Sequence, residues 1–409
     1  MKKLSSVAKP KLRFEGFSDY WNVKKLGEYL SFKNGINADK DSYGKGYKFI
    51  NVLDIINNDF ITNELITGSV DVDEKVFEKN EVSYGDILFQ RSSENREEAG
   101  QSNVYLDPDV TSCFGGFVIR GKAKKSYNPV YLNYLLKTHL ARKEIVTKSG
   151  GSTRYNVGQD TLSEVNIYIS DNELEQQKIA EFISSVDKKI SLLKEKHISL
   201  TQFKKAVMQK LLKQEIRFKD EHDNSFPDWK ETKLNNLISE CSEKSVVEDE
   251  YPVLSSTIKG IEKRSGRVDG ASNIGYKIIR REQLVLSPQN LWLGNINYND
   301  SFEVGLVSPS YKTFTFNTQL INPNYGKYLI KTPRMIYEYT VSSEMGASVV
   351  RRNLNMELFG GIKVSIPSIQ EQMKVADFLD ALDTKLDAIN KQIELTQTFK
   401  KGLLQQMFV

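Results

Sequence analysis

Two polar loops of the sequence carry side chains that can form paired hydrogen bonds. In the first half of the chain, the apolar segment that ends at Phe89 is followed by Gln90, Arg91, Ser92, Asn95 and Arg96. In the second half, the segment that ends at Leu286 is followed by Gln289, Asn290, Trp292 and Asn295. Arg, Asn and Gln are the side chains that bind base edges bidentately in the major groove of double-stranded DNA. The two loops therefore suit direct reading of a DNA sequence, and a solvated polar loop is the alternative that composition leaves open.

A glycine-serine segment accompanies basic residues in each half of the chain. In the first half, residues 149–152 lie among Lys148, Arg154 and Tyr155. In the second half, residues 346–348 precede Arg351 and Arg352. A flexible backbone with guanidinium groups suits contact with DNA phosphates, which positions a protein on the duplex without reading its sequence. We predict phosphate contacts here, with ordinary solvated charges as the alternative.

The motifs of common enzyme classes are absent from the sequence. It contains no GxxxxGK[ST] phosphate loop, no HExxH metal motif and no GxSxG nucleophile motif. The two cysteines, Cys113 and Cys241, have no second Cys or His at ligand spacing, which argues against a metal site and a disulfide framework. We therefore predict neither catalytic nor metal-binding residues in this chain.

One segment is similar to a catalytic motif. The Asn-Pro-Asn-Tyr segment at 322–325 resembles the Asn/Asp-Pro-Pro-Tyr/Phe motif of amino-methyltransferases, but it lacks the second proline and has no glycine-rich cofactor strand upstream. An Asn-Pro-Val-Tyr segment stands at the equivalent place in the first half, at 128–131. An Asn-Pro pair also starts an ordinary helix, with Asn as the N-cap and Pro in the first turn. The repetition favours this structural interpretation.

Two motifs occur twice and divide the chain into four parts. A Glu-Gln-x-Lys-Ile/Val-Ala-x-Phe motif starts at Glu175 and again at Glu371, an offset of 371 − 175 = 196 residues. An Arg-Phe pair followed by a Trp begins at Arg13 and again at Arg217. Such self-similarity is the signature of repeated structural units. We predict a first globular domain at 1–170, a long helix at 171–215, a second globular domain at 216–366 and a long helix at 367–409.

The two helical segments carry apolar residues at alternating spacings of four and three, which predicts a seam for a partner helix. A helix of about 40 residues spans roughly 60 Å, too long to bury its seam on one small domain, so an antiparallel pair is expected. Capping-box patterns at Ser170–Glu173 and Ser368–Glu371 predict the helix starts. The predicted seam comprises Ile183, Val186, Ile190, Leu193 and Leu200 in the first helix, Leu379, Leu382, Leu386, Ile389 and Ile393 in the second, and the polar residues His197, Lys204, Thr396 and Lys400 on the same spacing.

The globular parts contain short runs of β-branched and aromatic residues that predict strands. The predicted strands are 47–52, 86–89, 116–119 and 165–169 in the first half and 283–286, 313–316 and 363–366 in the second. Residues 131–143 and 325–339 are predicted to be helical. The expected fold is two repeated α/β domains separated by two long helices that pair as an antiparallel coiled coil.

Composition and charge limit the class of protein. Hydrophobic residues make up 39% of the chain and charged residues 27%. The sequence offers neither a run of about eighteen apolar residues nor an apolar stretch behind its basic N-terminus, so we expect a cytoplasmic protein without membrane contact. The formal net charge of +4 permits nucleic-acid binding without requiring it.

The duplicated motifs, taken together, resemble the specificity subunit of type I restriction-modification systems. The resemblance covers nearly the full length: the Arg-Phe…Trp domain starts, the Gly-Asp-Ile-Leu segment at 85–88 and both Glu-Gln-x-Lys helix starts match in the family's order. The second half departs at 282–284, where Glu-Gln-Leu stands in place of Asp-Ile-Leu.

The resemblance implies a chain without an active site and without a cofactor of its own. Each globular domain would recognise one half of an asymmetric, bipartite DNA site, and the helices would set the length of the unread spacer. Two DNA adenine methyltransferase subunits, which use S-adenosylmethionine, and two motor-endonuclease subunits, which use ATP and Mg²⁺, would be its partners. The alternatives are a freestanding adenine methyltransferase that uses the segment at 322–325, and a coiled-coil scaffold with no nucleic-acid role.

Overall fold

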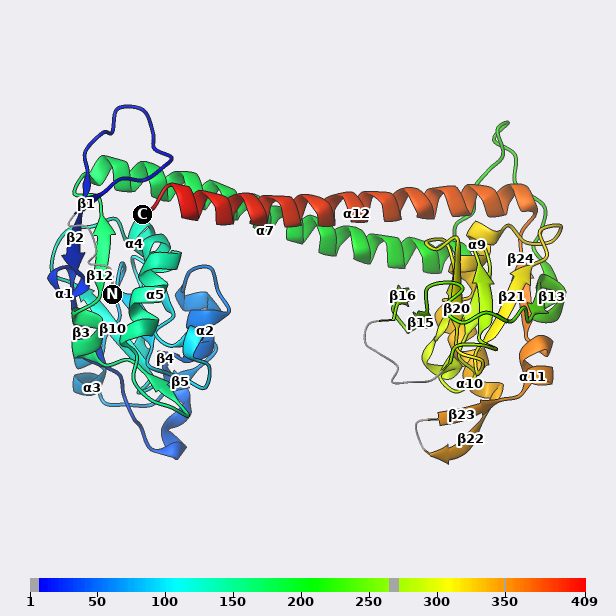
Figure 1. The fold of residues 1–409 in the computed structure, drawn as a ribbon, viewed down its shortest axis with the longest axis horizontal. Helices are drawn as coiled ribbons and strands as arrows, with labels where there is room; N and C mark the ends of the chain where they lie inside the picture. The colour runs from blue at the N-terminus through cyan, green and yellow to red at the C-terminus, as the bar shows by residue number, and fades with distance from the viewer. Residues whose placement is uncertain (1–6, 265–271, 349–350) are drawn as a thin grey trace. The chain divides into compact units, whose positions relative to one another are not determined.

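The structure is a computed structural model that describes residues 7–264, 272–348 and 351–409. The chain divides into two compact units. Unit 1 contains Met1–Glu195 together with Lys391–Val409, and unit 2 contains Lys196–Asn390. Each unit thus combines one globular domain with part of each long helix. The long helices are α7, Glu173–Leu212, and α12, Ile369–Gln406 (Figure 1).

Each unit contains an antiparallel sheet of four strands in the same order. In unit 1 the order is β3 (Leu30–Asn34), β10 (Val118–Ala123), β6 (Ile87–Gln90) and β8 (Ser102–Val104). In unit 2 it is β14 (Ile238–Cys241), β21 (Lys312–Phe316), β18 (Leu284–Leu286) and β19 (Ile296–Tyr298). The repeat found in the helix motifs therefore extends through the sheets, and the predicted strands 86–89, 283–286 and 313–316 lie within a residue or two of β6, β18 and β21.

Each unit contains two short helices in the segment that the sequence predicts to be helical. They are α4 (Pro129–Leu136) and α5 (His139–Lys148) in unit 1, and α9 (Pro323–Leu329) and α10 (Pro333–Val341) in unit 2. The prediction that 131–143 and 325–339 are helical is confirmed over most of both segments, although each contains two helices and not one. Thr138 and Thr332 interrupt the helices with extended backbone, at ψ of 157° and 149°, and each hydroxyl donates to a carbonyl of the preceding turn. Pro333 reinforces the second break, because the residue before a proline disfavours the helical conformation.

Smaller elements complete the domains. The remaining helices are α1 (Leu26–Tyr29), α2 (Val52–Ile56), α3 (Glu74–Lys79) and α6 (Gln159–Ser163) in unit 1, and α8 (Leu234–Leu237) and α11 (Met356–Gly361) in unit 2. The remaining strands are β1 (Val7–Ala8), β2 (Trp21–Lys25), β4 (Tyr43–Ile50), β5 (Ser69–Val70), β7 (Ser92–Ser93), β9 (Cys113–Phe114), β11 (Tyr155–Asn156) and β12 (Asn166–Ile169) in unit 1, and β13 (Lys230–Lys233), β15 (Leu254–Ser256), β16 (Ile261–Lys263), β17 (Lys277–Arg280), β20 (Val304–Val307), β22 (Ser343–Ser348), β23 (Arg351–Leu354) and β24 (Lys363–Ile366) in unit 2. Strands β12 and β24 pair with β2 and β13, which brings the chain to the start of each long helix.

The starts of the long helices differ in their caps. Ser368 accepts a hydrogen bond from the backbone N–H of Glu371, as predicted for α12. At α7 the N-cap is Asn172, whose side chain accepts from the backbone of Leu174 and Glu175, so the prediction of Ser170 as the cap is wrong. The Ser170 hydroxyl instead donates to the Glu175 carboxylate at 2.6 Å.

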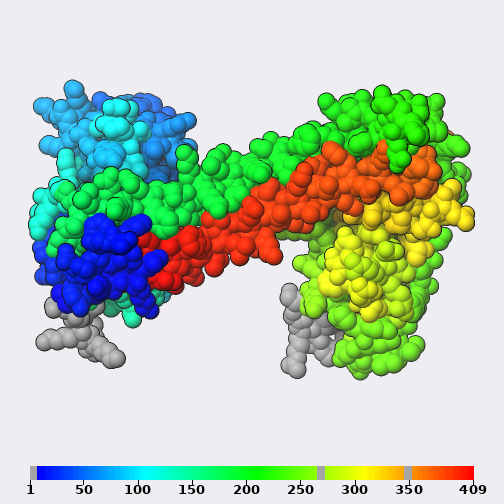
Figure 2. Space-filling model, turned by 90° about the horizontal axis from the view of Figure 1, so that it is seen from above, coloured from blue at the N-terminus to red at the C-terminus, as the bar shows by residue number. Residues whose placement is uncertain are grey.

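Within each unit the segments of α7 and α12 lie side by side and run in opposite directions (Figures 1 and 2). In unit 1, Ile183, Val186 and Ile190 share one hydrophobic cluster with Leu403 and Met407. In unit 2, Leu379 and Leu382 share another with Leu211, and Leu200 packs against it. Leu193, Leu386 and Ile393 are half-buried, and Ile389 is buried. Burial along both helices follows the spacing of the predicted seam.

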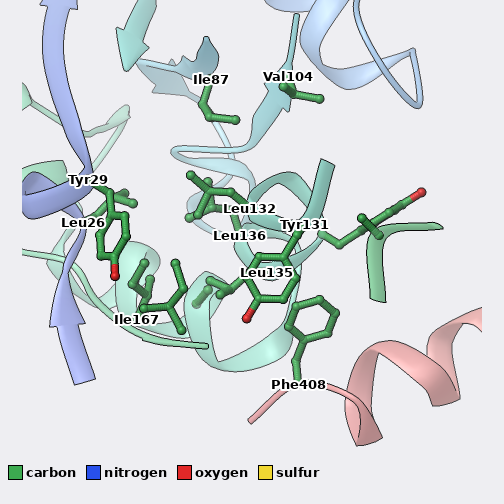
Figure 3. Close-up of a cluster of buried hydrophobic side chains, with 14 of the residues drawn as sticks. Leu26, Tyr29, Ile87, Val104, Tyr131, Leu132, Leu135, Leu136, Ile167 and Phe408 are labelled. Carbon is green, nitrogen blue, oxygen red and sulfur yellow. The ribbon is translucent and has the colours of Figure 1, made fainter. Parts of the chain in front are cut away.

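The core of unit 1 includes residues from both ends of the chain. Phe408, just beyond α12, packs its ring against Tyr131 of α4, with a centroid distance of 5.3 Å (Figure 3). The same ring lies 6.0 Å from that of Trp21 in β2. All three side chains are at most 3% exposed. The end of α12 therefore contributes directly to the domain that begins the sequence.

No helix in the described ranges is long and apolar enough to cross a membrane. Among the same residues, no group of three or more His, Cys, Asp or Glu side chains could hold a metal ion.

Candidate nucleic-acid interface

The first repeated motif forms a buried ion pair at the start of α7. Arg13 donates from Nε and Nη2 to the two carboxylate oxygens of Glu175, at 2.6 and 2.8 Å. The Trp21 indole donates to the same carboxylate at 3.0 Å. The side chains of Glu175 and Arg13 are 1% and 9% exposed. A bidentate guanidinium pair out of water is geometrically specific, so it fixes the first domain to the start of its helix.

The second copy of the motif repeats this arrangement in unit 2. Arg217 donates from Nε and Nη2 to Glu371 at 3.0 and 2.8 Å, and Trp229 donates to Glu371 at 3.2 Å. Residues that are far apart in the sequence but constant in the motif thus meet in one place. Their role is to hold the domain on the helix.

The glutamine of each helix motif connects to the Asn-Pro segments. Gln176 accepts a hydrogen bond from the backbone N–H of Asn128, and Gln372 accepts one from Asn322. Asn128 and Asn322 in turn cap α4 and α9 with their side chains, and a proline follows each in the first turn. The structural interpretation of the Asn-Pro segments is therefore confirmed. Tyr325, the last residue of the second segment, is fully buried.

The two predicted contact loops of unit 1 come together in one surface, here called rim 1 (residues 90–96 and 148–156). Strand β7 of the first loop pairs with β11 of the second. The Ser92 hydroxyl donates to Asn156 at 2.6 Å, and the Arg96 guanidinium lies over the Tyr155 ring at 5.9 Å. The loops predicted to contact bases and phosphates are thus parts of the same surface.

The residues of rim 1 differ in accessibility. Arg154 is 68% exposed and forms a long ion pair of 3.9 Å with Glu94, which is itself 86% exposed. Asn95 and Arg96 are also exposed. Arg91 is half-buried, and its Nη1 donates to the Gly116 carbonyl at 3.2 Å. Lys148, paired with Glu144 within α5, also lies at this surface.

Gln90 is the exception in rim 1. It is 6% exposed, and its Nε2 donates to the Ser92 carbonyl at 3.0 Å. Its Oε1 is buried with no hydrogen-bond partner among the described residues. Gln90 therefore supports the loop from beneath, and we remove it from the set of residues accessible to DNA.

Unit 2 has an equivalent surface, rim 2 (residues 287–293 and 351–352). The backbone N–H of Arg352 donates to the Gln289 carbonyl at 3.2 Å, and its guanidinium lies over the Trp292 ring at 4.7 Å. Gln289 is exposed, and Asn290, Trp292 and Arg352 are half-buried. An arginine stacked on an aromatic ring thus occurs in both rims. The side chain of Arg351 lies outside what the structure describes.

Asn295 does not belong to the accessible surface. It is 5% exposed, its Nδ2 donates to the Ser256 carbonyl at 2.9 Å, and its Oδ1 accepts from the Ser256 hydroxyl at 2.8 Å. Asn297, also buried, joins the same network. The expectation that Asn295 touches DNA is wrong, because both ends of its amide are used inside the domain.

Two basic residues that sequence reasoning missed hold the loops behind the rims. In unit 1, Arg142 of α5 donates to the carbonyls of Gly100 and Ala99 at 2.6 and 2.7 Å, and burial lowers its pKa to about 10. In unit 2, Lys331 donates to the Gly294 carbonyl at 3.0 Å, and burial lowers its pKa to about 8. Neither position is marked by a motif in the sequence. Arg142 reaches its loop from α5, whereas Lys331 lies in the short connection between α9 and α10, so both contacts follow only from tertiary packing.

Comparison with known proteins agrees with this architecture. The family model of the type I restriction modification DNA specificity domain matches residues 18–202 and 229–397, one copy in each half. A putative type I restriction enzyme MjaX specificity subunit of Methanocaldococcus jannaschii is 22% identical over 408 residues, which cover 94% of this chain and 92% of that protein. The MjaVIII specificity subunit of the same organism is 26% identical over 206 residues, 47% of this chain and 45% of that protein.

A solved structure shares the fold. The S subunit of a type I restriction-modification system from M. genitalium superposes with a TM-score of 0.56 at 17% sequence identity, over 98% of this chain and 99% of that one. Since the family model matches both halves of the sequence, and most of its length, the chain belongs to the type I restriction-modification DNA specificity subunits.

Proposed function

We propose that this chain is the non-catalytic sequence-recognition subunit of a type I restriction-modification complex, and that each rim reads one half of a bipartite DNA site. The observation that carries the proposal is the duplicated rim. In both units, a loop after a central strand and a second loop bearing basic residues meet around an arginine stacked on an aromatic ring. Stacking restricts the guanidinium in advance, so less conformational freedom is lost when it binds a base or a phosphate.

The division of labour within each rim follows from exposure. Arg154 is exposed and forms only a weak ion pair. It therefore suits contact with a DNA phosphate, because such a contact depends on charge more than on an exact orientation of the side chain. Asn290 sits on a backbone fixed by hydrogen bonds to Ser287 and Leu293, and its half-buried amide suits a base edge. Rim 1 therefore offers a group for positioning, and rim 2 offers a group for reading.

The long helices are the proposed site for two adenine methyltransferase subunits, and their length is proposed to set the spacer between half-sites. Motor-endonuclease subunits would complete the restriction complex. S-adenosylmethionine would bind to the methyltransferase subunits, and ATP and Mg²⁺ would bind to the motor-endonuclease subunits. A structure that concerns complex assembly and conformational transition of the type I restriction-modification system aligns over 94% of this chain, with a TM-score of 0.56 and 11% identity. The shared fold supports, for this chain, a role within such an assembly.

The two other function classes have less support. A freestanding methyltransferase would need the amide of Asn322 at its substrate, but that amide oxygen caps α9. A purified chain that binds S-adenosylmethionine or methylates DNA alone would restore this class. A coiled-coil scaffold without a nucleic-acid role does not account for two DNA specificity domains.

The test separates reading from positioning. Methylated adenines are first mapped in DNA from a host that carries the system, which gives the site. Binding of the full chain, with its methyltransferase, is then measured against cognate and single-mismatch duplexes at several salt concentrations. Asn290→Ala should reduce discrimination at particular base pairs by about 1–3 kcal/mol if its contact is bidentate.

Arg154→Ala should weaken binding to all sequences alike and reduce the salt slope by about 0.9 if one phosphate contact is lost. Lys25→Ala is the matched control, since it also removes an exposed cation from a surface ion pair but lies outside the rim. Equal behaviour of the Arg154 and Lys25 variants, together with unchanged discrimination in the Asn290 variant, would refute the proposed contacts.

A further inference from the structure

Two lysines on the predicted seam form ion pairs between the long helices. In unit 1, Lys400 of α12 pairs with Asp187 of α7 at 2.5 Å, and their side chains are 22% and 9% exposed. Tyr134 of α4 donates to the same carboxylate at 2.7 Å, and its ring lies under the lysine at 5.6 Å. One triad thus joins the first domain, α7 and α12.

Unit 2 contains the same triad with the helices exchanged. Lys204 of α7 pairs with Asp383 of α12, and their side chains are 18% and 42% exposed. The Tyr328 hydroxyl of α9 lies 2.6 Å from the Asp383 carboxylate, and its ring lies under Lys204 at 4.9 Å. Every member corresponds to its counterpart in unit 1 through the repeat. We call the two triads the register locks: Tyr134, Asp187 and Lys400 in unit 1, and Tyr328, Asp383 and Lys204 in unit 2.

Stability alone is a poor explanation for charges at these positions. Lys204 lies between the apolar seam residues Leu200 and Val207, and Lys400 lies one seam position before Leu403. In unit 1, where Asp187 is nearly buried, the loss of hydration offsets most of the attraction between the charges, and apolar residues of similar size at such sites often stabilise a protein. In unit 2, where Asp383 is 42% exposed, solvent weakens the attraction itself. A polar residue at a seam position instead selects one register of a helix pair at a cost in stability.

The two locks require the same register. The sequence separation from Asp187 to Lys204 in α7 equals that from Asp383 to Lys400 in α12. An antiparallel pair without a shift therefore satisfies both locks. If α12 slid by one heptad in either direction, Lys204 would face Ala376 or Asn390, neither of which is a carboxylate.

A slid register fails equally at the other lock. Lys400 would then face Ala180 or Lys194. The apolar seam repeats every seven residues and therefore tolerates a slide of one heptad. The locks exclude these shifted registers, which the seam alone would permit.

We propose that the register locks are positioning residues for DNA recognition: they fix each domain on the helix pair and thereby determine which spacer length between half-sites is accepted. The inference rests on the proposed function and deepens it. Each lock includes a tyrosine that also packs in the hydrophobic core of its own unit, Tyr134 of α4 or Tyr328 of α9. Loss of a lock lets the domain and the helices shift relative to each other while leaving the reading loops unaltered.

The test measures spacer discrimination separately from half-site binding. Duplexes carry the two mapped half-sites at the native spacer or at spacers one base pair shorter or longer, and a further duplex carries one half-site alone. For Lys204→Met, we expect the preference for the native spacer to fall toward unity while affinity for the single half-site is unchanged. Lys205→Met is the matched control, since this exposed neighbour on α7 lies outside the lock.

Charge exchange provides the rescue. Lys204→Asp should abolish spacer discrimination, and adding Asp383→Lys should restore it by reversing the pair. A purely structural role would lower the midpoint of urea unfolding and half-site affinity together, without this pattern. If the exchanged pair does not fold, the Lys204→Met and Lys205→Met comparison still decides the question.

The outcomes separate the two proposals. Wild-type chain that binds neither half-site selectively would refute the proposed function. Wild-type chain that is selective, with Lys204→Met variants that retain full spacer discrimination, would overturn the locks and leave the proposed function standing.

Discussion

Lengthening both long helices by the same amount should change the spacer and leave the half-sites unaltered. The perturbation inserts four helix-forming residues after Lys194 in α7 and four at the equivalent place, after Asn390, in α12. Both insertions fall between the register locks. Because the two helices gain equal lengths, one antiparallel register still satisfies both triads.

The magnitude follows from helix geometry. Four residues add about 6 Å at 1.5 Å per residue. They also turn the helix by about 400°, so the seam ends only about 40° from its starting phase, an offset that coiled coils absorb. Base pairs stack about 3.4 Å apart. We therefore expect a spacer longer by one or two base pairs.

Rotation and length favour different values within this range. DNA turns about 35° per base pair, from roughly 10 to 10.5 base pairs per turn. The offset of about 40° matches one additional pair, whereas the length matches nearly two.

A four-residue insertion in α7 alone should also lengthen the spacer. This variant should accept a broader range of spacers than the double insertion, because one register of the helix pair no longer forms both locks.

The assay is methylome mapping of hosts that carry each variant with its methyltransferase. The expected result is methylation of the same two half-sites at the longer spacer. A matched insertion of two residues is the control, since it turns the seam by about 200° and should abolish assembly. A functional four-residue variant with an unchanged spacer would refute the reasoning, because DNA geometry or the partner subunits would then set the distance.

Three further predictions test other parts of the structure. Glu175→Gln removes the carboxylate that faces the nearly buried Arg13, and should lower the free energy of unfolding by about 3–5 kcal/mol in urea titrations, whereas a change under 1 kcal/mol would contradict a structural ion pair. Replacing Ile190 and Leu386 together with Asp introduces charge into the seam, so gel filtration should show lost assembly with the methyltransferase or lost solubility; a soluble, fully assembling variant would argue against the helix pair. Exchanging residues 20–165 for the first domain of another family member should change one half-site only in the methylome, and a change in both or in neither would exclude independent reading.

The parts of the fold that the sequence predicts are those governed by periodicity and repetition. The seam spacing identifies α7 and α12 nearly to their ends, because a long helix is determined by local pattern over many turns. The Asn-Pro segments are assigned correctly because capping chemistry is local and the second copy removes the ambiguity. By contrast, the break at Thr138 depends on one side chain and its tertiary surroundings, which no periodic pattern in the sequence indicates.

The candidate interface is predicted less completely. The sequence indicates both loops of each rim, but not that they adjoin, because β7 and β11 are short strands with weak propensity and a distant pairing. Asn295 has the chemistry of a base-reading residue and lies in a suitable loop, yet Ser256, distant in sequence, uses its amide. Composition cannot distinguish an amide that faces DNA from one that closes an internal network.

The placement of Phe408 in the core of unit 1 has a consequence during protein synthesis. Tyr131 and Trp21 emerge from the ribosome early, but the ring that packs against them, Phe408, is synthesised 408 − 131 = 277 residues after Tyr131. All of unit 2, Lys196–Asn390, is translated in between. At about 5–20 residues per second, the first domain waits on the order of 10–40 s with this apolar face uncovered. During that interval we expect the uncovered face to bind chaperones or to misassemble with other nascent chains. The yield of correctly folded protein should therefore depend on how fast unit 2 is made.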